Sequence, residues 1–162
     1  MITGQAASMG IYRALEKRAN LPGSMTFETN GTQKLTEPFK QWIKDIPEEI
    51  FFSVSPKLFT VSGEKTAKAI KPENVKEYAE CSDRGQLKFV VGSERRQWEE
   101  LENTVRKFRE AGIDWPVWIM PTGAREEEQT ATAGQVAEEA FKRGYNVAAR
   151  VHVYLFGNAI GT

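Results

Sequence analysis

The sequence predicts one domain of the α/β class, built on a parallel sheet that is either an open sheet or part of a (βα) barrel. Apolar, strand-like segments alternate with helix-like segments along the chain, which is typical of parallel sheets with right-handed crossovers. The 162 residues are 40% hydrophobic, enough for one core. No composition shift or low-complexity linker interrupts them, so we expect residues 1–162 to form a single domain.

The first half of the chain predicts two complete strands and the end of a third. Residues 1–4 resemble the last residues of a strand. The Leu-Pro-Gly sequence at residues 21–23 ends the helix that follows, because proline and glycine both disfavour helix continuation. In order, we expect a helix over residues 9–18, a strand over 25–28, a helix over 37–44 and a strand over 50–55. Residues 58–71 are polar and aperiodic, which predicts a loop.

The second half continues the alternation with longer elements. Its clearest helix has apolar residues at Trp98, Leu101, Val105 and Phe108, spacings of three and four that mark one helical face, and it ends at Gly112. We expect helices over residues 72–81, 94–111 and 130–143, and strands over 86–91, 116–120 and 146–156. The acidic run at residues 126–128 is interpreted as a solvated face near a helix N-terminus.

Charge and cysteine content exclude several classes of function. The 22 basic and 22 acidic side chains are interspersed, so no basic surface for nucleic acid or membrane is expected. Cys81 is the single cysteine, which excludes an internal disulfide framework and any metal site built from several cysteines of this chain. No segment approaches the roughly 20 apolar residues of a membrane span, and no signal-peptide pattern is present. We expect a cytoplasmic protein.

Polar side chains follow most of the predicted strands. Because the C-terminal ends of parallel strands meet at one edge of a sheet, these side chains are expected to form a site for an anionic, hydroxyl-rich small molecule. The alternatives are a plain Asn-Gly turn at residues 30–31 and a plain strand terminator at residues 55–57. The residues concerned are Thr3, Glu28, Thr29, Asn30, Ser55, Pro56, Lys57, residues 121–123, Arg150 and His152.

Two titratable residues inside predicted strands have open interpretations. His152 is the only histidine and would share one strand face with Arg150 and Tyr154. It is either a satisfied structural histidine or a substrate contact that titrates in a useful range. Lys88 lies between Leu87 and Phe89, so it either faces solvent or points into a site, where it requires a partner.

Six segments, taken in order, resemble one known family. They are ITG, FETNGT, SVSPK, LKFVV, MPTG and RVHVYLFGNAIGT, and they extend over essentially the whole chain. This series resembles the 7-carboxy-7-deazaguanine synthases, radical S-adenosylmethionine enzymes of queuosine and deazapurine biosynthesis. The resemblance implies a reduced radical S-adenosylmethionine barrel. It also implies conversion of 6-carboxy-5,6,7,8-tetrahydropterin to 7-carboxy-7-deazaguanine and ammonia, with S-adenosylmethionine, a [4Fe-4S] cluster and Mg2+.

The resemblance also implies roles for individual residues. Contacts to S-adenosylmethionine are implied for Gly4, Glu28, Ser55, Pro56 and Lys57. Contacts to the pterin substrate are implied for Thr3, His152 and the terminal carboxylate of Thr162. It identifies no catalytic residue.

The chain departs from the family in three respects. It has no CxxxCxxC triplet, it lacks the region with the magnesium-binding hydroxyl, and Gln5 stands where the family motif has its second glycine. We therefore expect the C-terminal part of such an enzyme, without its first βα unit and inactive alone. Its partner would be a complementing N-terminal fragment or a second copy of the chain. The alternatives are a noncatalytic binding or interaction protein and a generic α/β enzyme that uses Glu28 or His152 for acid–base chemistry.

Overall fold

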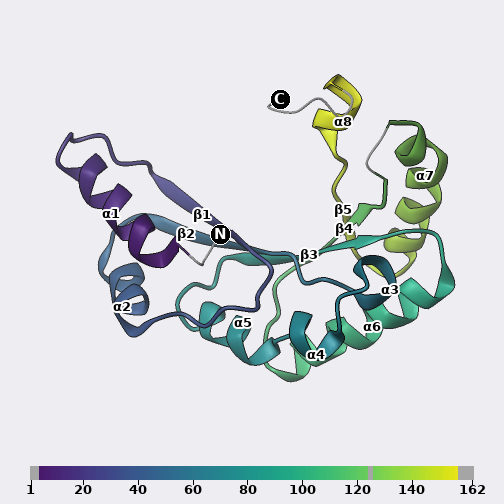
Figure 1. Ribbon diagram of the computed structural model, residues 1–162, viewed down its shortest axis with the longest axis horizontal. Coiled ribbons are helices and arrows are strands. Elements are labelled where there is room, and N and C mark those ends of the chain that lie inside the picture. The colour runs from purple at the N-terminus through teal and green to yellow at the C-terminus, as the bar shows by residue number, and fades with distance from the viewer. Residues whose placement is uncertain (1–3, 124–125, 157–162) are drawn as a thin grey trace.

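One parallel sheet organises the described part of the chain, within which it has five strands. The computed structural model describes residues 4–123 and 126–156. The strands lie side by side in chain order, so every crossover advances in the same direction (Figure 1). They are β1 (Ser24–Thr29), β2 (Glu49–Val54), β3 (Gly85–Val91), β4 (Val117–Pro121) and β5 (Asn146–Val147). This confirms the expected α/β class and the parallel sheet.

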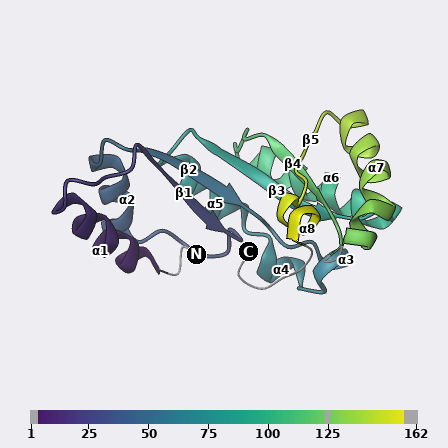
Figure 2. The ribbon, with the colours of Figure 1, turned by 90° about the horizontal axis from the view of Figure 1, so that it is seen from above.

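Helices cover one face of the sheet and leave much of the other open. Figure 1 shows α2, α5 and α6 below the sheet and α8 above its β4–β5 end, and Figure 2 looks onto the open face. The helices in chain order are α1 (Gln5–Glu16), α2 (Glu37–Asp45), α3 (Phe59–Ser62), α4 (Thr66–Ala69), α5 (Pro72–Ala79), α6 (Arg95–Glu110), α7 (Glu126–Lys142) and α8 (Val151–Phe156). None of them, within the described residues, is long and apolar enough to cross a membrane.

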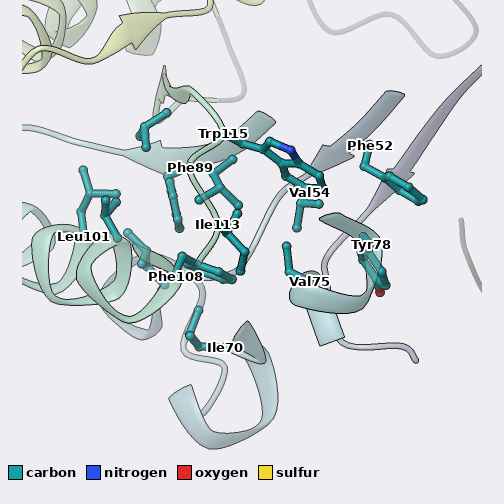
Figure 3. Packing of buried hydrophobic residues seen from close by; sticks show 14 of the residues in the cluster. Phe52, Val54, Ile70, Val75, Tyr78, Phe89, Leu101, Phe108, Ile113 and Trp115 are labelled. Carbon is teal, nitrogen blue, oxygen red and sulfur yellow. The ribbon is translucent and has the colours of Figure 1, made fainter. Parts of the chain in front are cut away.

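The alternation of side chains in β3 shows how the two faces differ. Leu87, Phe89 and Val91 are fully buried against the helices, whereas Lys88 and Val90 are half-buried on the open face. Phe89 packs against Phe108 of α6, with ring centroids 6.4 Å apart (Figure 3). The apolar core therefore lies on the helical face, and polar side chains are free to line the other.

The loop expected over residues 58–71 is wrong, because this segment contains α3 and α4. Three of its apolar residues belong to the core, with Leu58 2%, Ala69 1% and Ile70 7% exposed. The carboxylate of Glu100 in α6 accepts hydrogen bonds from the backbone N–H groups of Phe59 and Thr60, each at 2.8 Å. This partner is some 40 residues away along the chain, so a local pattern contains no sign of it.

The strand expected over residues 146–156 is also wrong. Only Asn146 and Val147 pair with β4, and residues 151–156 form α8. Val153 is buried while Val151 and Leu155 are exposed. At about 100° per residue, positions two apart lie on nearly opposite sides of a helix, whereas they share a face in a strand. Over six residues both arrangements produce an alternating pattern, and the expected common strand face of residues 150, 152 and 154 does not exist.

Candidate functional site

A groove of about 490 Å³ lies on the open face at the C-terminal edge of the sheet. It receives side chains from β1 to β4 or the residues just after them, and from the segment after β5, which agrees with the edge at which parallel sheets place ligands. The lining residues are Glu28, Thr29, Asn30, Ser53, Ser55, Lys57, Lys88, Val90, Met120 and Arg150.

The turn after β1 is held by its own side chains. The Thr29 hydroxyl accepts a hydrogen bond from the Gly31 N–H at 3.1 Å, and the Asn30 side-chain oxygen accepts one from the Thr32 N–H at 3.1 Å. Gly31 has a φ of +81°, and a Cβ there would lie 3.0 Å from side-chain atoms of Val54 and Val75. The Asn-Gly turn predicted from the sequence is thus present, and its first residues line the groove as well.

The end of β2 is joined directly to the end of β1. The Ser55 N–H donates to the Thr29 carbonyl at 2.7 Å, which continues the strand pairing by one residue. Ser55 is half-buried, Pro56 is buried and Lys57 is exposed. The buried proline fixes the backbone between Ser55 and Lys57, and both of these residues line the groove.

Lys88 points into the groove and has an acidic partner there. Its Nζ lies 3.7 Å from Oε1 of Glu28. The Lys88 side chain is 21% exposed and that of Glu28 is 74% exposed. Of the two alternatives for this lysine in the middle of a strand, the structure shows the second: Lys88 points into a groove and has an acidic partner there.

Arg150 enters the groove from the segment between β5 and α8. Its Nε donates to the sulfur of Met120 at 3.0 Å, and its Nη1 donates to the Gly123 carbonyl at 3.2 Å. Both acceptors are uncharged, and a thioether is a weak one. The guanidinium keeps further N–H donors for a ligand, because it has five in all.

The structure brings together some of the predicted site residues and not others. Glu28, Ser55 and Lys57 line the groove, whereas Pro56, which is buried, and Gly4, at the start of α1, are outside its lining. Thr3 and Thr162 lie outside the described residues, and so does the side chain of His152, whose backbone is part of α8 rather than of a strand.

Gln5 has a structural role at the position where the family motif has glycine. Its side-chain amide donates to the Lys34 carbonyl at 2.8 Å, and its side-chain oxygen accepts from the Thr36 N–H at 2.8 Å. Gln5 thereby ties the start of α1 to the loop that leads into α2. Its side-chain oxygen also accepts a hydrogen bond from the Thr36 hydroxyl at 2.9 Å, so the side chain is committed to this loop.

Ser53, Val90 and Met120 were not singled out in the sequence, although they line the groove. Each lies on the open face of its strand. Ser53 precedes Ser55 by two residues and Val90 follows Lys88 by two, so the period of two along a strand was the available signal. The Ser53 hydroxyl accepts a hydrogen bond from the Gln86 side chain at 2.9 Å.

The described residues do not supply the cysteine ligands of an iron–sulfur cluster, because Cys81 is the only cysteine. They contain no group of three or more His, Cys, Asp or Glu side chains arranged to hold a metal. Cys81 lines a different groove with Glu49 and Ile50, where β2 begins, at the opposite edge of the sheet. Burial raises the pKa of its thiol, which favours the protonated form.

Comparisons with known proteins identified no relative of this chain. A scan against protein-family models found no match, and searches of curated proteins and of solved structures found none either.

Proposed function

We propose that this chain is a 7-carboxy-7-deazaguanine synthase-like protein of the radical S-adenosylmethionine type, and that the groove binds S-adenosylmethionine beside a pterin substrate. The observation that carries the proposal is the convergence of Glu28, Ser55 and Lys57 in one groove at the ends of two adjacent strands. The choice of family rests on the resemblance of the six sequence motifs. The parallel sheet, with its strands in chain order, is compatible with part of a barrel.

The polar side chains of the groove suit the ribose and the methionine moiety of S-adenosylmethionine. A carboxylate at a strand end accepts hydrogen bonds from both ribose hydroxyls, which is the role proposed for Glu28. The Lys57 ammonium pairs with the carboxylate of the methionine moiety, and the Ser55 hydroxyl donates to or accepts from either part. Val90 and Met120 supply apolar contact. When reductively cleaved, S-adenosylmethionine supplies a radical that abstracts hydrogen.

The cluster that cleaves S-adenosylmethionine does not fit this chain alone, because three cysteine ligands are needed and Cys81 is the only cysteine. In the proposal, these ligands come from another polypeptide segment. The role of the residues described here is to bind and orient the cofactor and the substrate.

Calorimetric titration with S-adenosylmethionine tests the binding proposal. We expect Glu28→Gln, Ser55→Ala and Lys57→Met each to weaken binding by about 5- to 30-fold, since each removes one or two hydrogen bonds or a charge. Lys107→Met and Glu110→Gln, near the end of α6 and outside the groove, are charge-matched controls with unchanged affinity. No binding by the folded wild-type chain, or equal losses in the controls, would overturn the proposal.

Complementation in trans separates a synthase from a noncatalytic binding protein. The chain is co-expressed anaerobically with a polypeptide that carries a CxxxCxxC triplet, and formation of 7-carboxy-7-deazaguanine is followed by mass spectrometry. We expect product only when both polypeptides are present and Glu28 is intact. Binding without product would favour the noncatalytic alternative.

A further inference from the structure

The groove carries more positive than negative charge. Its lining includes the cations Lys57, Lys88 and Arg150 and the single carboxylate Glu28, which leaves two positive charges in excess. A concave surface with one sign of charge attracts ligands of the opposite sign. The groove thus favours an anion, and the arrangement of its charges indicates where that anion binds.

Of the three cations that line the groove, Lys88 has an ion pair, whereas Lys57 and Arg150 have none among the described residues. Lys57 is exposed and Arg150 is half-buried, so Arg150 is the more enclosed of these two. Its hydrogen bonds go to the Met120 sulfur and to the Gly123 carbonyl, neither of which neutralises a guanidinium. These two contacts orient the side chain at the rim of β4, and Val90, beside Met120 in the strand register, lines the same part of the groove. Arg150 is therefore held in place and keeps its charge and its further N–H donors.

Lys88 has a partner, but the contact is loose. The 3.7 Å separation from Glu28 exceeds the 2.7–2.9 Å of a charge-assisted hydrogen bond. Most of the Glu28 side chain faces solvent, so its carboxylate loses little interaction free energy when it moves away from the lysine. Lys88 is the more buried member of the pair. Because water solvates its ammonium less, a closer anion stabilises it more.

We propose that Lys88 and Arg150 form an oxyanion site that takes a carboxylate or phosphate group of the ligand, and that Glu28 competes with this group for Lys88. Binding of the anion releases Glu28, whose carboxylate then accepts hydrogen bonds from ligand hydroxyls. The inference deepens the proposed function and rests on the same groove. It does not require that the ligand be S-adenosylmethionine.

Titration with inorganic phosphate and with succinate, followed by the amide chemical shifts of residues 88–92, 120, 122 and 123, tests the site at low ionic strength. We expect Lys88→Met and Arg150→Met each to weaken anion binding by about 5- to 10-fold, the usual size of losing one charged contact. Glu28→Gln is expected to strengthen it about threefold because a competitor is removed. The control Lys107→Met is unchanged, and thermal denaturation verifies that each variant is folded.

The outcomes for the two proposals differ. Anion binding with this pattern but no affinity for S-adenosylmethionine overturns the proposed function and leaves the oxyanion site standing. Equal anion affinity in wild type, Lys88→Met and Arg150→Met overturns the oxyanion site. Unchanged or weaker anion binding by Glu28→Gln overturns the competition. Tighter binding of succinate assigns the site to carboxylates, and tighter binding of phosphate assigns it to phosphates.

Discussion

The ammonium of Lys88 in β3 lies 3.7 Å from the carboxylate of Glu28 in β1, so the ion pair crosses over β2 on the open face of the sheet. Water reaches this face, and the acidic partner is mostly exposed. Ion pairs of this kind contribute about 0–1 kcal/mol to folding, because solvent screens the attraction and ordering two long side chains has an entropic cost. The pair is therefore better placed to respond to a ligand than to stabilise the fold.

A double-mutant cycle on Lys88→Met and Glu28→Gln measures the contribution of this pair. We expect a coupling free energy below about 1 kcal/mol in dilute buffer and close to zero in 1 M salt, because salt screens a solvated pair. The measurement is urea denaturation of the four proteins. The exposed Arg95–Glu99 pair of α6, at 2.7 Å, is the reference. A coupling free energy above about 2 kcal/mol would show that the pair contributes substantially to the stability of the fold.

Two glycine-to-alanine changes should have opposite effects on stability. A Cβ at Gly85 would lie 2.5 Å from two ring atoms of Trp115, which stacks on Phe52 and donates its indole N–H to the Asp83 carbonyl. Because this ring cannot move freely, Gly85→Ala should lower the free energy of unfolding by about 3 kcal/mol. A Cβ at Gly10 meets nothing within 4 Å in α1, so Gly10→Ala should raise it by about 0.5–1 kcal/mol.

Chemical denaturation of the two variants beside the wild type checks both values. A Gly85→Ala protein as stable as the wild type would contradict the packing of Trp115 against the start of β3. A destabilised Gly10→Ala protein would contradict the open surroundings of that position in α1.

Three tyrosines should ionise only at high pH. Burial raises the pKa of Tyr12, Tyr78 and Tyr145 from 10.0 to about 12, with the carboxylates of Glu48 and Glu102 adding to the effect at Tyr12 and Tyr145. The folded state therefore holds these protons more tightly than the unfolded state. Their contribution to stability is fully present below pH 10 and decreases as the pH rises from 10 towards 12.

Absorbance near 295 nm follows phenolate formation in the folded protein. We expect three of the four tyrosines to titrate near pH 12, and Tyr78→Phe to remove one of these late ionisations. Titration in urea, where all tyrosines ionise near pH 10, is the control. Ionisation of all four near pH 10, with the circular dichroism of the folded state retained, would contradict the burial of these hydroxyls.

Period-two and helical patterns predicted the elements that carry the core. The helix around Leu101 and the strand around Phe89 were recognisable because each buries one periodic face. Glu28, Ser55 and Lys57 were recognisable as residues that line one groove, because strand ends in a parallel sheet converge by geometry. Ser53 and Met120 were not, since small or apolar residues inside a strand carry no chemical signal of their own.

The alternation of strands and helices, the parallel class of the sheet and the polar residues at its C-terminal edge could be predicted from the amino-acid pattern, because they depend on local periodicity. The helix at residues 59–62, the departure of residues 151–156 from the sheet and the contact of Lys88 with Glu28 across β2 became known from the three-dimensional structure alone. These features depend on partners distant in the chain, such as the Glu100 carboxylate at the start of α3, and local patterns do not encode contacts of that range.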